Sequence, residues 1–139
     1  MGHGNASSID VLKVFFLNNY DPAWRTNANV FISLHTDDPG VGGNQLTHEA
    51  AYTSYDRVQV AKTAVGWTLD GTSYKNAAAI IFSKCTGSSS LVTHVAIGTV
   101  DKVTGAGQIL FSGALGEPLA VSNLIQPQFE PNALVAGEA

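Results

Sequence analysis

Residues 29–35 read Asn-Val-Phe-Ile-Ser-Leu-His, and this stretch decides the fold. Every second residue from Val30 to Leu34 is a branched aliphatic, which is the period of a β-strand with one buried face. The run Asp-Asp-Pro-Gly at 37–40 ends the strand, because Pro and Gly supply turn dihedrals that a strand does not use. We expect a long surface loop over residues 40–54 to follow.

The same alternation recurs in several short segments, each bounded by Gly, Asp, Ser or Thr. They span residues 55–62, 66–69, 74–84, 91–97, 108–114 and 125–129. Their spacing is roughly ten residues, and no second helical pattern separates them. The sequence therefore predicts an all-β fold, an antiparallel β-sandwich of the jelly-roll type. Because residues 74–84 are apolar on both faces, we expect them to form a central strand.

The alternation also predicts which side chains point inward. One buried face per strand gives the expected core, which consists of Val30, Ile32, Leu34, Val58, Val60, Ile80, Phe82, Val95, Ile97, Ile109 and Phe111.

A short helix is predicted before the first strand. Ser7 can cap it, and Ile9, Leu12 and Phe16 fall on one face before it ends near Asn18. A helix this short is marginal alone, so its apolar face must dock on its own domain or on a neighbour.

These patterns divide the chain into three parts. Residues 1–28 form a helix and linker arm, residues 29–130 the jelly-roll sandwich, and residues 131–139 an extended C-terminal tail. We expect both ends, residues 1–20 and 125–139, to be interface arms that add little to the core of the domain.

Composition excludes several classes of protein. The net charge is −4, and the sequence contains no cluster of Lys and Arg residues. Both features argue against direct contact with nucleic acid or an anionic membrane. Only 13% of residues are charged, and such a surface suits contact with other proteins. The single cysteine, Cys85, excludes an internal disulfide. The first residues lack the features of a secretory signal, so we expect synthesis in a cytoplasm.

Residues able to carry chemistry are sparse. His35, Asp37 and Asp38 could hold a divalent cation, but adjacent Asp residues before Pro-Gly are a common turn. Neither His48 nor His94 has the spacing of a zinc site, and no serine-nucleophile motif occurs. Cys85, Ser88–Ser90 and the scattered acids support no defined mechanism. We expect no enzymatic activity, no catalytic residue, no cofactor and no metal.

Aromatic residues leave an alternative open. Trp24, Trp67, Tyr52, Tyr55 and Tyr74 could form a platform on which sugars stack. Carbohydrate binding therefore remains a second hypothesis beside a purely structural role.

The order of the short motifs resembles a known family. The matching segments are 30–40 (VFISLHTDDPG), 55–58 (YDRV), Trp67, 75–78 (KNAA), Phe82, 92–98 (VTHVAIG) and 109–115 (ILFSGAL). In this order they resemble small virion proteins of tailed bacteriophages, over about residues 9–130. Ala96 stands where the family pattern has Gly, and Pro127 and Pro131 depart from it as well.

The resemblance implies a role. In length and pattern the chain is most similar to the jelly-roll cement protein of Bordetella phage heads. That similarity implies a structural protein on the capsid surface, made in the bacterial host cytoplasm, which decorates and cements the shell. Its implied partners are the major capsid protein and other copies of itself, as a homodimer or higher oligomer. A tail-fibre or carbohydrate-binding module of the virion is the alternative.

Overall fold

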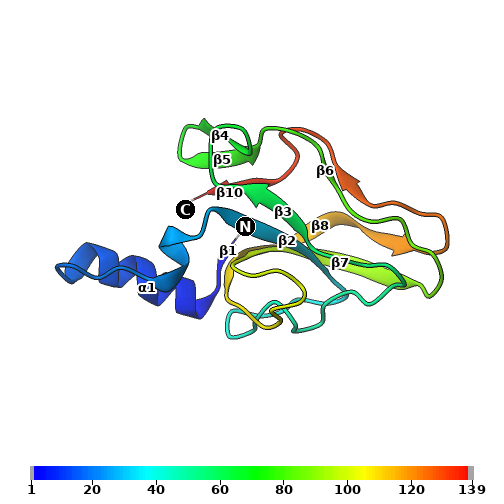
Figure 1. Cartoon of the computed structure of the whole chain (residues 1–139), viewed down its shortest axis with the longest axis horizontal. Helices are drawn as coiled ribbons and strands as arrows, with labels where there is room; N and C mark the ends of the chain where they lie inside the picture. The colour runs from blue at the N-terminus through cyan, green and yellow to red at the C-terminus, as the bar shows by residue number, and fades with distance from the viewer. Residues whose placement is uncertain (1, 138–139) are drawn as a thin grey trace.

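The protein is a β-sandwich with one helix projecting from it (Figure 1). This computed structural model describes residues 2–137. Two helical elements precede the sandwich: α1 (Asn5–Phe16) and a 3₁₀ turn, η1 (Ala23–Thr26). The strands are β1 (Gly2–His3), β2 (Asn29–His35), β3 (Val58–Ala61), β4 (Trp67–Asp70), β5 (Ser73–Asn76), β6 (Ile80–Ile81), β7 (Ser90–Gly98), β8 (Ile109–Val121), β9 (Gln128–Phe129) and β10 (Val135–Gly137).

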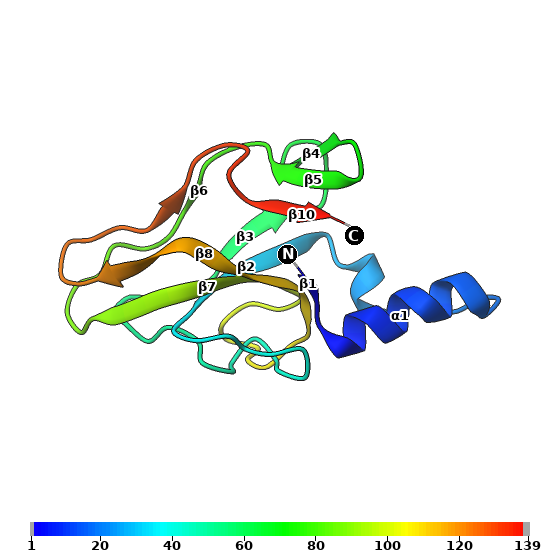
Figure 2. The ribbon, with the colours of Figure 1, turned by 180° about the vertical axis from the view of Figure 1, so that it is seen from behind.

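The strands form three antiparallel sheets. The largest has the order β1-β8-β7-β2-β3, and a three-stranded sheet with the order β10-β5-β4 lies across from it (Figure 2). β6 and β9 form a separate pair. The antiparallel β-sandwich predicted from the alternation is therefore confirmed.

Strand β2 is more deeply buried than alternation predicts. Ser33 and His35, on its second face, are fully buried together with Ile32 and Leu34. The loop over residues 36–57 covers that face, and the Ala50 N–H donates to the Leu34 carbonyl at 2.8 Å.

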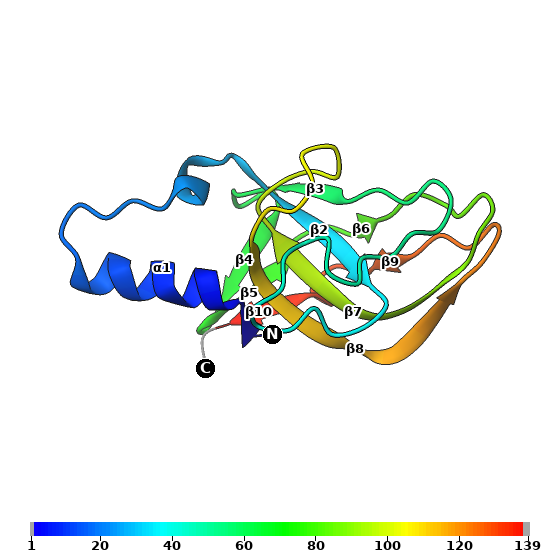
Figure 3. The same cartoon turned by 90° about the horizontal axis from the view of Figure 1, so that it is seen from below.

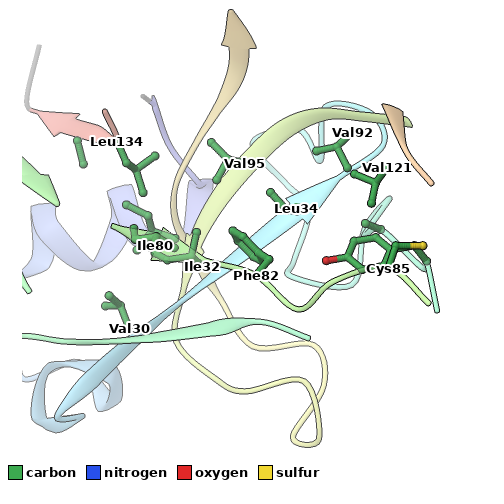
Figure 4. Packing of buried hydrophobic residues seen from close by; sticks show 14 residues of the cluster. Val30, Ile32, Leu34, Ile80, Phe82, Cys85, Val92, Val95, Val121 and Leu134 are labelled. Atoms are coloured by element: carbon green, nitrogen blue, oxygen red, sulfur yellow. The ribbon is translucent and has the colours of Figure 1, made fainter. Parts of the chain in front are cut away.

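The predicted core is confirmed in its main features. Eight of the eleven expected residues are buried, and Val58, Val60 and Phe111 are partly buried and pack against the cluster. Figure 4 shows Ile32, Leu34 and Phe82 near the centre of this cluster.

The single central strand expected over residues 74–84 is wrong. Two short strands, β5 and β6, belong to different sheets, and Ile81 is half exposed. Asn76 causes the break, because its side-chain amide donates to the carbonyls of Ala78 at 2.8 Å and Glu130 at 2.9 Å. Those bonds turn the chain away from β5.

Strand β8 is longer than the predicted 108–114. It continues to Val121 through Gly116 and Pro118, residues that favour a turn. A register shift between Val92 and His94 of β7 accompanies this continuation. A bulge of this kind lets an irregular segment stay paired.

The expectation that both ends add little to the core is wrong for the C-terminal tail. β10 pairs with β5, and Leu134 is only 3% exposed within the core cluster. The Leu134 N–H also donates to the buried Asn76 side-chain oxygen at 2.8 Å. The tail is extended, as expected, but it completes the smaller sheet.

The N-terminal helix departs from its predicted cap. Gly4 occupies the N-cap position, and the Ser7 hydroxyl donates instead to the Ile109 carbonyl. A side chain on Gly4 would put its Cβ 2.8 Å from that same carbonyl oxygen, so only glycine lets the helix start this close to β8. Within residues 2–137, no helix has the length and apolar character that a membrane crossing requires.

Candidate functional site at one end of the sandwich

Helix α1 projects from one end of the sandwich, as Figure 3 shows. Its exposed large hydrophobic residues, with the residue that follows it, are Ile9, Leu12, Val14, Phe15, Phe16 and Leu17. Phe16 is 80% exposed. The expected apolar face is present, and within the described residues 2–137 its side chains are largely uncovered. Exposed apolar clusters of this kind usually mark contacts with another molecule.

The base of α1 is held firmly. Beyond the Ser7 bond, Asp10 accepts hydrogen bonds from Trp24 Nε1 at 2.7 Å, from Gln108 Nε2 at 3.0 Å and from the Tyr20 hydroxyl. Burial alone would raise the pKa of Asp10, but these bonds hold it below its ordinary value. The charged Asp10 therefore joins the helix to η1 and to the segment entering β8, while the C-terminal half stays free of the sandwich.

An apolar groove lies between the two main sheets at the same end of the molecule. Its volume is about 590 Å³. The lining residues are Val30, Lys62, Thr63, Ala64, Trp67, Leu69, Tyr74, Ile97, Leu110, Phe111 and Ala136. Binding pockets typically enclose about 300–1,000 Å³, so the groove has room for several side chains.

Lys62 is the one charged residue of this lining. Its ammonium donates to the carbonyls of Trp24 at 3.1 Å and Arg25 at 3.2 Å. Burial lowers its pKa. Lys62 thus fixes η1 beside the groove and places a positive charge at its wall.

The five candidate aromatic residues do not form one platform. Tyr52 and Tyr55 pack edge to face, with ring centroids 5.3 Å apart, and Trp24 is bonded to Asp10. Trp67 and Tyr74 lie on the β4–β5 hairpin, where both line the groove. The sequence identified two groove residues but not the groove.

The candidate metal ligands are not brought together. His35 is buried, with Nδ1 2.8 Å from the Thr47 carbonyl and Nε2 2.8 Å from the Ser33 hydroxyl. Asp37 and Asp38 lie in an exposed turn, where each accepts a backbone N–H. Among residues 2–137 no three His, Cys, Asp or Glu side chains are grouped as a metal site requires.

The remaining candidate residues from the sequence are His94, Cys85 and His48. His94 lies on β7, where its Nδ1 is 2.8 Å from the Thr93 hydroxyl. Cys85 is buried and its thiol donates to the Ser88 carbonyl at 3.1 Å. His48 is exposed in the loop that covers β2.

A buried ion-pair network was missed by the sequence analysis. Arg57 binds Glu49 through two nitrogens, at 2.7 and 2.9 Å, and the Tyr55 hydroxyl donates to the same carboxylate at 2.7 Å. Burial would raise the pKa of Glu49, but the hydrogen bonds from Arg57 and Tyr55 hold it below its ordinary value. The sequence feature that could have indicated this network is the motif at 55–58, which supplies both Tyr55 and Arg57.

Gln45 is a second polar residue that the sequence analysis missed. It is fully buried, and its side chain bonds the backbone of Thr99 and Val100. A Cβ on Gly98 would come within 2.1 Å of the Gln45 side chain, so glycine at this position leaves the space that Gln45 occupies.

Comparison with known families gives the identity of the chain. Residues 11–137 match the family described as podophage GP4 fiber I protein gp80. The chain belongs to this family. It is therefore a structural protein of a phage virion, as the motif order suggested, and the family takes its name from a fibre rather than from a capsid cement protein. None of the curated proteins matches the chain.

Proposed function

We propose that the protein is a non-enzymatic jelly-roll component of a phage fibre, joined to its neighbours through the end that carries α1 and the groove. The observation that carries the proposal is the exposed apolar helix beside an apolar groove, in a chain of a fibre family. A structural part needs no reacting group, only a surface that its neighbours cover.

The proposed role relies on repetition of the same contact between many copies. Each copy buries a modest patch, and many linked copies turn modest contacts into a stable assembly. The apolar end suits such contacts, because aromatic and aliphatic side chains supply most of the binding energy at interfaces.

Carbohydrate binding by the groove is less well supported. Sugar sites combine aromatic faces with several polar groups, whereas this lining is mainly aliphatic and aromatic and its Lys62 is already bonded to two carbonyls. Capsid cementing, the role implied by the resemblance to phage head proteins, is the competing structural hypothesis.

Electron microscopy of labelled virions separates the two roles. An antibody raised against the purified protein, followed by a gold-conjugated second antibody, should place gold on fibres. Pre-immune serum is the control. Gold spread over the head at many sites would overturn the fibre role in favour of capsid cementing.

A further inference from the structure

Each chain carries two apolar surfaces at one end that its own fold does not bring together. The first is formed by the exposed apolar side chains of α1 and the residue after it, from Ile9 to Leu17, and the second is the groove between the sheets. The helix cannot swing into its own groove, because Ser7 and Asp10 fix its base to β8 and η1. Both surfaces are therefore open to another molecule.

We propose that the occupant of the groove is helix α1 of a second copy of this chain, inserted tip first. This inference deepens the proposed function by naming the partner of its apolar end. Helix-in-groove recognition uses anchors at positions i, i+3 and i+7, and Ile9, Leu12 and Phe16 have that spacing. The same contact made in both directions would give a closed, two-fold symmetric dimer.

The exposed area agrees with a second copy as partner. With large apolar side chains presenting roughly 150–250 Å² each when fully exposed, the six exposed residues of 9–17 present on the order of 600 Å². A stable interface needs about 800 Å² from each partner, and in a reciprocal exchange each copy contributes both a helix and a groove. The exposed helix side chains account for most of that area, and the groove would supply the rest.

Charge supports the direction of insertion. The C-terminal end of a helix carries a partial negative charge on its last carbonyls. A tip-first helix brings those carbonyls toward Lys62, whose ammonium uses two of its three protons on Trp24 and Arg25. The remaining proton can be donated to a carbonyl near Phe16 of the inserted helix.

Solution mass tests the proposal with the full chain. Multi-angle light scattering should give twice the 14.5 kDa chain mass at micromolar concentration. Phe16→Asp, on the helix, and Leu69→Asp, in the groove, should each raise the dissociation constant at least about 100-fold. Val103→Asp is the matched control, because Val103 is 96% exposed in the turn between β7 and β8 and does not line the groove, and it should leave the dimer intact.

Mixing the two variants distinguishes the proposed contact from pairing between helices. The Phe16→Asp chain keeps an intact groove and the Leu69→Asp chain keeps an intact helix, so an equal mixture should recover a heterodimer that neither variant forms alone. Loss of association in Phe16→Asp with none in Leu69→Asp would show helix-to-helix pairing and overturn the proposal.

Cross-linking gives a second readout. The single native cysteine, Cys85, is buried, so introduced thiols react selectively. Mixing Phe16→Cys with Leu69→Cys should give a disulfide-linked pair under mild oxidation, and Val103→Cys with Leu69→Cys should not. A chain that stays monomeric at 100 µM or more overturns the inference, whereas gold on fibres in the same virions would leave the proposed function standing.

Discussion

Arg57 shows how one residue holds together loops far apart in the sequence. Its side chain and that of Glu49 are 0% and 3% exposed, and a further nitrogen of Arg57 donates to the carbonyls of Val100 and Asp101. Removing one member of such a pair leaves a buried charge without its counter-ion, which costs far more than the intact pair contributes. The pair therefore fixes the loop that covers β2.

The first prediction concerns this pair. Arg57→Ala should lower the free energy of unfolding by about 3 kcal/mol, because the buried Glu49 carboxylate keeps only the partly exposed Lys102, at 3.4 Å, as a counter-ion. Lys75→Ala, which breaks the solvent-exposed pair with Asp70, should leave it near the wild-type value. Urea denaturation measures both. Equal losses in the two variants would contradict the structural role assigned to the buried pair.

His35 makes stability depend on pH. A carbonyl only accepts, so Nδ1 donates to Thr47, and in the neutral ring Nε2 then accepts from the Ser33 hydroxyl. Burial lowers the pKa of His35 below the ordinary value of 6.5. As the pH falls below about 6.5 the unfolded chain therefore takes up a proton before the folded one does.

The second prediction follows from that sign. The stability contribution of neutral His35 is complete above pH about 6.5 and is lost as the pH falls toward the lower folded-state pKa. Thermal melting between pH 7.5 and 5.5 should show a falling midpoint, and His35→Asn should flatten this part of the profile. Exposed His48→Asn is the control and should keep the wild-type slope. An unchanged slope in His35→Asn would exclude His35 as the source.

At the scale of elements, the sequence predicted the positions of the strands that have a regular apolar alternation. β2 and β7 lie where residues 29–35 and 91–97 indicated. It could not predict the break after β5, which depends on long-range bonds from Asn76 to Glu130. The groove was hidden for the same reason, because its lining comes from both sheets.

The third prediction uses the alternation between Leu134 and Val135, where β10 begins. Leu134 is in the core, whereas its neighbour Val135 is 38% exposed. Leu134→Ala should lower the free energy of unfolding by about 2–4 kcal/mol, through lost burial and a residual cavity. Val135→Ala should change it by less than about 1 kcal/mol. Chemical denaturation of the two variants makes the comparison, and similar losses would mean that the strand register is different.

At the scale of the whole molecule, the two ends of the chain have different roles. The C-terminal segment supplies core side chains and a strand of the smaller sheet. The N-terminal segment adds a two-residue strand to the edge of β8 and then leaves the sandwich as α1. One end contributes mainly to stability, and the other exposes apolar side chains to solvent.

The fourth prediction compares removal of the two ends. Deleting residues 131–139 removes Leu134 and Ala136 from the core and leaves Asn76 without its Leu134 partner, so the melting midpoint should fall by roughly 10–15 °C. Deleting residues 1–17 removes mainly exposed side chains, so the midpoint should fall by about 5 °C or less while self-association is lost. Calorimetry and light scattering on the two truncated chains test both effects. A larger thermal loss from the N-terminal deletion would show that α1 stabilises the sandwich directly, and that its apolar face is covered within the chain in solution.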